Sequence, residues 1–267
     1  MLIKTPEEIK LIKQGGQIMG RILDDLAKMC RPGMSTWEVD QAAEKMIIEV
    51  GGRPAFKGYK NKPSDIPFPS TICASINEEV VHGIAKKTAI LKNGDVFTID
   101  IGMQWPYNGP KDEGYFTDTA VTIPIGKIPP KTRELLRVTQ ESLERGIKVI
   151  KPGNTIADIG KAIEDYIKSQ GKYGIVQDLV GHGVGHEVHE EPRIPNFYDR
   201  GLDFIILKPG MVVAIEPMVS LGTWRVKTAE DGWTIRMADN SLSAHFEHTI
   251  IVTKSGNIVA TRRPSEK

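Results

Sequence analysis

The chain has 267 residues, of which 40% are hydrophobic and 26% charged, and this globular composition excludes a disordered or collagen-like polymer. With 35 basic and 34 acidic residues the net charge is +1, which excludes the basic surface of a dedicated nucleic-acid-binding protein. Two cysteines are too few for a disulfide scaffold, and neither a secretory signal nor a run of ~18 apolar residues is apparent, so we expect a cytoplasmic protein without a membrane span.

Helical periodicity predicts four helices that form two pairs. The first pair runs from Thr5 to the Pro32-Gly33 break and from Ser35 or Thr36 to Gly51-Gly52. The second pair spans 131–150 and 156–169, with a Lys-Pro-Gly break between its members. The similar spacing of the two pairs is the first sign of an internal repeat.

The strands that follow each helix pair carry the same repeat. Leu91–Asp100 aligns without a gap on Leu207–Glu216, and each segment is a turn followed by an alternating strand that we expect to end in a carboxylate. Two β-branched runs, around Asp118 and Glu247, also have a carboxylate near their start. We therefore predict one domain over residues 1–267, with two similar halves at about 5–125 and 130–255 related by an approximate two-fold axis.

Two irregular stretches rich in Pro, Gly, Asn and Lys separate these elements. They are Lys57–Pro69 and Gln104–Gly114, and both are predicted to be loops.

The repeated carboxylates are the main candidates for chemistry. A single strand carboxylate is usually exposed or salt-bridged, because burial of an isolated charge is costly. The repeat, however, brings four to the centre of the predicted fold, where like charges would raise each other's pKa. Divalent cations resolve this repulsion, so we predict a metal site at Asp100, Asp118, Glu216 and Glu247.

The six histidines are less informative one by one. His186 and His189 are three residues apart in a Gly-rich segment, so they do not form the zinc motif that needs two histidines four apart on a helix. We interpret His245 and His248 as packed residues that flank Glu247. The other four histidines, His82, His182, His186 and His189, lie in two segments that contain glycine, Val81–Gly83 and Gly181–Pro192.

Short segments spread over nearly the whole chain are similar, in order, to the motif series of type I methionine aminopeptidases. These segments are Ser75–Gly83, Ile99–Gly102, Thr117–Thr119, Gly181–Gly185, Val188–Pro192, Ile215–Met218 and Glu247–Ile250. The resemblance implies an α+β, duplicated pita-bread fold, in which helices lie outside a curved antiparallel sheet. It also implies an enzyme that removes the N-terminal methionine when the second residue is small.

The resemblance further implies a dinuclear metal centre. Asp100 would hold one ion, His182 and Glu216 mainly the other, and Asp118 and Glu247 would bridge them. Co, Mn, Fe and Zn all suit such a donor set, and two ions activate water and polarise the scissile carbonyl.

Residues around the metals receive roles in the same way. Glu216 would also move the water's proton, His189 would stabilise the oxyanion, and His82 would bind the scissile amide and assist the leaving nitrogen. The methionine side chain would occupy a pocket formed by four further residues. They are Tyr59, Phe68, Cys73 and Trp233.

Two alternatives concern the site. The stretch between Asp100 and Asp118 is longer than is usual in the family and contains Asp112 and Glu113, although Thr-Asp-Thr followed by β-branched residues favours Asp118. His186 stands where an arginine is common, which changes the surroundings of the pocket.

Two alternatives concern function. One is a prolidase-like or Xaa-Pro aminopeptidase, and the other is a non-catalytic pita-bread protein that binds partners. The favoured enzyme would act as a monomer on nascent polypeptide N-termini, at the ribosome, with neither sequence-specific nucleic-acid contact nor a membrane.

Overall fold

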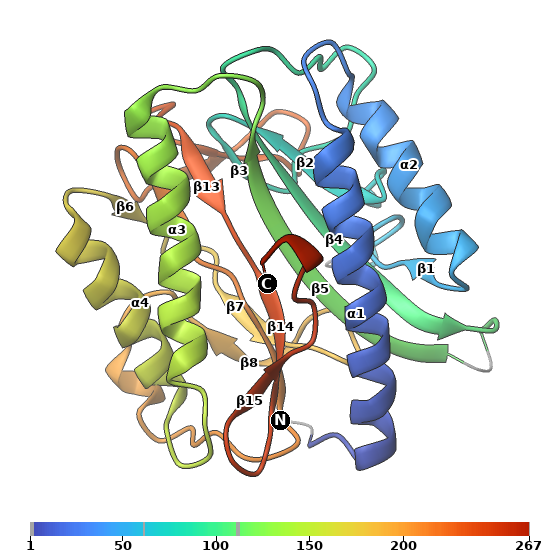
Figure 1. Cartoon of the computed structure of the whole chain (residues 1–267), viewed down its shortest axis with the longest axis vertical. Coiled ribbons are helices and arrows are strands. Elements are labelled where there is room, and N and C mark those ends of the chain that lie inside the picture. The colour runs from blue at the N-terminus through green and yellow to red at the C-terminus, as the bar shows by residue number, and fades with distance from the viewer. Residues whose placement is uncertain (1–2, 61, 111–112, 267) are drawn as a thin grey trace.

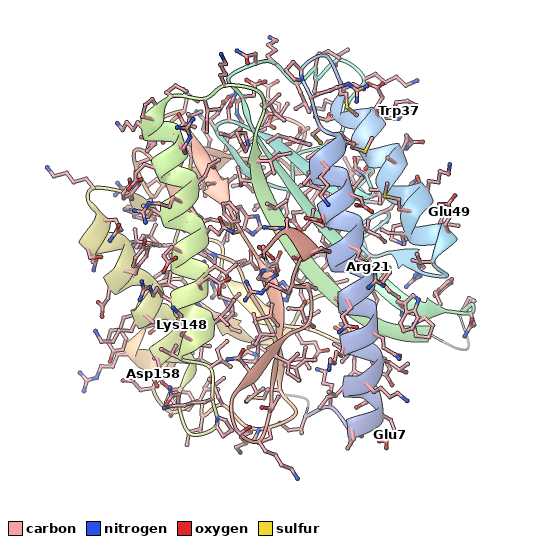
Figure 2. All side chains as sticks on the ribbon, viewed as in Figure 1. Glu7, Arg21, Trp37, Glu49, Lys148 and Asp158 are labelled. Atoms are coloured by element: carbon pink, nitrogen blue, oxygen red, sulfur yellow. The ribbon has the colours of Figure 1, made fainter. Side chains whose placement is uncertain are left out.

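The computed structural model describes residues 3–60, 62–110 and 113–266. It contains the four predicted helices, and Figure 1 shows α1 and α3 in front of the strands with the C-terminal segment between them. Figure 2 adds the side chains, with Arg21 of α1 and Lys148 of α3 among those labelled. No helix of the described residues is long and apolar enough to cross a membrane. The helices are α1 (Pro6–Met29), α2 (Thr36–Glu49), α3 (Pro130–Lys148) and α4 (Ile156–Gln170).

The second helix of each pair begins in the same way. Ser35 caps α2 and Thr155 caps α4, each in a reciprocal capping box with the residue three positions on. Each cap residue also forms an isolated β-bridge, Ser35 to Ile90 and Thr155 to Ile206. Those two partners immediately precede the segments that align in the repeat, so the internal symmetry extends from the sequence to the backbone pairing.

The first half is built around one long hairpin of two 12-residue strands, β4 and β5. All neighbouring strands pair antiparallel, and the order is β1-β4-β2 with β5 on β4. The strands are β1 (Arg53–Pro54), β2 (Ile72–Ile76), β3 (Glu79–Val81), β4 (Val96–Tyr107) and β5 (Glu113–Pro124).

This hairpin corrects two sequence-based predictions. The strand does not end at Asp100 but continues to Tyr107, and much of the Gln104–Gly114 stretch is strand. The ladder continues through this stretch: the backbone of Trp105 pairs with that of Tyr115, and the indole N–H of Trp105 donates to the carbonyl of Val50 at 3.0 Å. The Lys57–Pro69 stretch has no regular structure in its described residues, as predicted.

The second half contributes shorter strands. Its main sheet has the antiparallel order β15-β14-β9-β7-β8, and a bridge between Ala120 and Glu247 joins it to the first half. Its strands, with those of two small sheets, are β6 (Gly174–Ile175), β7 (Gly181–Gly183), β8 (Glu190–Ile194), β9 (Val212–Ile215), β10 (Met218–Ser220), β11 (Val226–Thr228), β12 (Ile235–Met237), β13 (Ser243–His245), β14 (His248–Val252) and β15 (Asn257–Val259). Short 3-10 turns lie at Arg200–Leu202 and Pro264–Glu266.

The largest cluster of buried apolar side chains draws on both halves. It includes Leu23 of α1 and Phe97 of β4 together with Ile163 of α4 and Val213 of β9. The helices therefore pack on a continuous apolar layer of the strands, and the acidic residues of the strands are left to face inward.

Candidate metal centre

Asp100 and Asp118 lie in the interior of the β4–β5 ladder. Asp100 is opposite Ala120 and Asp118 is opposite Gly102, and the two residues are 7% and 3% exposed. The backbone of Asp118 is fixed from the other half of the chain, because its N–H donates to Thr249 Oγ1 at 2.9 Å and its carbonyl accepts from the same hydroxyl at 2.8 Å. Both aspartates are thus held in a closely hydrogen-bonded sheet.

Glu216, Glu247 and His182 come from the second half. Glu216 follows β9 and Glu247 precedes β14, while His182 is the middle residue of β7. His182 Nδ1 lies 2.9 Å from the carbonyl oxygen of Gly183, which can only accept, so Nδ1 donates and Nε2 is free to bind a cation. Nε2 lies 3.6 Å from Glu216 and 3.8 Å from Asp118.

These five side chains converge in overlapping groups that could hold metal ions. In one group the ligand atoms of His182, Glu216 and Glu247 lie within 4.8 Å of one another, and in a second those of Asp100, Asp118 and Glu247 do. Glu247 belongs to both groups, as a bridging ligand would. A third group within the same distance combines Asp118 and His182 with His189.

The electrostatics of the cluster match a cation site. Burial raises the pKa of Asp100 to about 7, and burial with the neighbouring carboxylates raises the pKa values of Asp118, Glu216 and Glu247 well above their usual range. Several of their oxygens have no hydrogen-bond partner. They are Asp100 Oδ1, Asp118 Oδ1 and Glu247 Oε1. Divalent cations would supply the missing partners and remove the repulsion, so these residues fit a metal pair.

Two histidines extend the site beyond the carboxylates. Burial lowers the pKa of His82 to about 4, and desolvation also lowers the pKa of His189, so both imidazoles are neutral at neutral pH. His189 Nδ1 lies 2.9 Å from the hydroxyl of Tyr59, and its ring meets that of His182 at a centroid distance of 4.5 Å. His82 faces the indole of Trp233, with ring centroids 6.3 Å apart.

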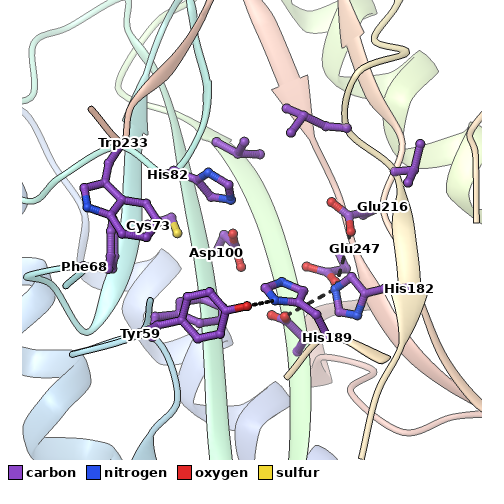
Figure 3. A pocket seen from close by; sticks show the side chains of 15 residues that line it. Tyr59, Phe68, Cys73, His82, Asp100, His182, His189, Glu216, Trp233 and Glu247 are labelled. Atoms are coloured by element: carbon purple, nitrogen blue, oxygen red, sulfur yellow. Dashed lines mark hydrogen bonds and ion pairs between the residues drawn. The ribbon is translucent and has the colours of Figure 1, made fainter. Parts of the chain in front are cut away.

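All eleven predicted site residues line one cavity of about 320 Å³. Figure 3 shows Phe68, Cys73 and Trp233 on one side and the acidic cluster on the other. Phe68 and Trp233 pack edge to face at 5.3 Å between ring centroids. The sequence analysis missed Phe56, Val81, Leu179 and Val180, which also line the cavity, because an apolar residue in the sequence carries no signal that separates a pocket wall from a core.

The histidines interpreted as packed residues differ from each other. His248 lies away from the cluster, with Nδ1 3.0 Å from Thr261 Oγ1 and Nε2 3.3 Å from Glu266. His245 is buried and faces the cluster, with Nε2 3.6 Å from Glu216 and 4.0 Å from Glu247. The alternative ligand Asp112 lies outside the described residues.

Comparisons with known proteins agree with this geometry. Residues 10–254 match metallopeptidase family M24. The chain is 42% identical to methionine aminopeptidase 1 of Bacillus subtilis over 264 residues, covering 98% of this chain and 99% of that protein. The methionine aminopeptidase of Aquifex aeolicus is also 42% identical, over 96% and 97% of the two chains.

Solved structures give the same result. The methionine aminopeptidase of Thermotoga maritima superposes with a TM-score of 0.90 at 40% identity and covers 98% of this chain and 100% of that one. The prolidase of Pyrococcus furiosus superposes with a TM-score of 0.74 at 26% identity, and the match covers 97% of this chain but 65% of the prolidase.

Proposed function

Because the chain belongs to metallopeptidase family M24, we infer that its buried acidic cluster and the adjoining apolar pocket form the active site of a methionyl aminopeptidase. The activity is that of a metal-dependent exopeptidase that removes the initiator methionine, and the fold is the duplicated pita-bread fold. One observation carries the assignment: two overlapping groups of possible metal ligands and a set of apolar side chains line the same cavity.

Two divalent ions are assigned to five residues. Asp100 would hold one, His182 and Glu216 would hold mainly the other, and Asp118 and Glu247 would contribute to both, which the overlap of the ligand groups at Glu247 and Asp118 supports. Bound there, the ions polarise the scissile carbonyl and lower the pKa of water. Co, Mn, Fe and Zn all fit a donor set of carboxylates with one imidazole.

The remaining polar residues act on the substrate and on protons. Glu216, whose carboxylate faces the cavity, accepts a proton from the attacking water and passes it to the leaving amine. When the Tyr59 hydroxyl donates to His189 Nδ1, His189 keeps its proton on Nε2, which becomes a donor to the oxygen of the attacked carbonyl. Neutral His82 hydrogen-bonds the scissile amide from the opposite side of the cavity.

The apolar side of the cavity accepts the methionine side chain. Phe68, Cys73 and Trp233, with Tyr59 at the edge, bury a long unbranched side chain, a gain of about 1.5–3 kcal/mol. A charged first residue is rejected by the cost of its desolvation. The second residue must pass close to the ligand cluster for its amide to be attacked, so a bulky side chain there lowers kcat/KM.

The substrates are therefore N-termini of newly made polypeptides. We propose that the chain works in the cytoplasm as a single 1–267 catalytic domain and as a monomer. We further propose that it meets these N-termini at the ribosome.

Peptide hydrolysis by the metal-loaded protein tests the assignment. Met-Ala-Ser should release free methionine, whereas Met-Leu-Ser and Leu-Ala-Ser should be cleaved poorly and Ala-Pro not at all. Efficient cleavage of Ala-Pro without cleavage of Met-Ala-Ser would favour the proline-specific relatives, which share the fold. Failure to cleave any peptide with each of the four metals would favour a non-catalytic binding protein.

A further inference from the structure

The connection between β7 and β8 carries His189 but has no regular secondary structure. It covers residues 184–189 and includes Gly185 at a φ of +135°. Within the connection, the N–H of Gly185 donates to the carbonyl of Glu187 at 3.1 Å. The carbonyl of Gly185 accepts from the N–H of Phe116 in β5 at 2.7 Å. His189 at its far end therefore depends on other contacts for its position.

A buried ion pair with Lys4, near the start of the chain, supplies one of these contacts. Lys4 Nζ lies 2.5 Å from Glu190 Oε2, and the two side chains are 1% and 6% exposed. The other oxygen of Glu190 accepts the backbone N–H groups of His186 at 2.6 Å and Glu187 at 3.2 Å. One carboxylate thus joins the first residues of the chain to the connection, at the position directly after His189.

Lys4 is itself held firmly in place. Its backbone N–H donates to the carbonyl of Gly210 at 2.8 Å, and its side chain lies against Gly185, where a Cβ atom would come within 2.6 Å of Lys4 Cε. A second contact runs parallel to the first, because His186 Nε2 lies 2.7 Å from a carboxylate oxygen of Glu8 in the first turn of α1. The N-terminal segment therefore supports one side of the connection over most of its length.

We propose that Lys4 and Glu190 are positioning residues that set the backbone of His189 for the aminopeptidase reaction. Tyr59 orients the imidazole through Nδ1, while the ion pair determines where the backbone places that imidazole in the cavity. Loss of either partner leaves the other buried and unpaired, which drives the connection to rearrange. The proposal rests on the proposed role of His189 in catalysis, where a displacement of about 1 Å can cost 10²-fold in rate.

The decisive experiment is a double-mutant cycle with the metal-loaded enzyme and Met-Ala-Ser as substrate. Lys4→Met should lower kcat by about 10- to 100-fold with bound metal unchanged. In a His189→Ala background the same substitution should cost almost nothing further, because the group that it positions is already absent. Glu190→Gln should repeat this result, and it carries the cycle if Lys4→Met does not fold.

A matched control is available on α4. Glu164 makes the same two kinds of contact as Glu190, an ion pair with Lys168 at 2.6 Å and acceptance of the Tyr198 N–H at 3.0 Å. It lies on α4 and not beside His189, and the Lys168 side chain is 67% exposed. Lys168→Met should leave kcat unchanged in both backgrounds.

The outcomes separate the two proposals. If His189→Ala leaves kcat unchanged, the catalytic role of His189 is wrong. If His189→Ala lowers kcat but Lys4→Met and Glu190→Gln have no effect, or lower kcat equally in both backgrounds, the positioning role is overturned.

Discussion

The two halves of the molecule present equivalent ligands in different ways. Asp100 and Asp118 lie in the interior of two 12-residue strands, whereas Glu216 and Glu247 lie just outside the ends of strands of four and five residues. The sequence repeat therefore conserves where a carboxylate stands along the chain but not how it is held. In the first half the backbone ladder places the ligand, and Thr249 of the second half holds Asp118 further.

In the second half, contacts with other segments replace the ladder. The carbonyl of Glu216 accepts from Asn196 Nδ2 at 3.0 Å, and the backbone of Glu247 pairs with Ala120 of the opposite half. The connection that bears His189 continues this pattern, because side chains of Lys4, Glu8 and Tyr59 support it. Both halves supply metal ligands, so we expect ligand substitutions in either half to weaken metal binding. We expect substitutions around the connection that bears His189 to act mainly through the position of that imidazole.

The largest effect on metal binding and kcat should follow from removing a predicted metal ligand of the first half. Asp118→Asn keeps the shape of the side chain but removes its charge, so we expect loss of bound metal and a fall in kcat of about 10³-fold. The ladder should keep the variant folded, which circular dichroism would show. Asp112→Asn is the control: if it lost metal while Asp118→Asn kept it, the second aspartate would be misassigned.

A smaller effect should appear when the metals are removed with a chelator. Burial raises the pKa of Asp100 from 3.8 to about 7, so the folded state without metal binds a proton that the unfolded state releases. This contribution to stability is complete below about pH 4 and is lost as the pH rises towards 7. Metal binding needs the deprotonated carboxylates and therefore has the opposite dependence.

Calorimetry of chelated and metal-loaded protein between about pH 5 and pH 8 would measure this difference. The gap in Tm between the two forms should widen as the pH rises, and Asp100→Asn should flatten the profile of the chelated form. A gap that narrows with rising pH would contradict the assignment of these carboxylates as ligands.

The sequence predicted those parts of the molecule that depend on local signals. Caps and periodicity located the helices, and the repeat aligned Asp100 with Glu216 because each stands at the same distance from a similar turn. The hairpin extension was missed because Pro106, Asn108 and Gly109 are typical of loops, whereas the backbone pairing of Trp105 with Tyr115 and its hydrogen bond to Val50 hold the extended strand. Local composition does not report such packing.

Contacts between distant residues explain the rest of what was missed. Lys4 and Glu190 are separated by 186 positions, and neither residue type signals burial. His245 lacked a motif, yet β13 turns it towards Glu216. Such positions follow only from how the two halves meet.

The smallest effect concerns the feature in which the halves agree. Ser35 accepts the N–H of Glu38 at 3.3 Å, and Thr155 accepts that of Asp158 at 3.2 Å, so each side-chain oxygen satisfies one free donor in the first turn of its helix. Ser35→Ala and Thr155→Ala should each lower the free energy of unfolding by about 0.5–2 kcal/mol and leave kcat unchanged.

Urea unfolding of the metal-loaded protein would measure both values, with Thr155→Val as a control that keeps the methyl group. Nearly equal losses are expected because both caps make the same contacts and both also bridge to the residue before the repeated segment. A loss confined to one half would mean that the helices, like the ligands, are held by different means in the two halves.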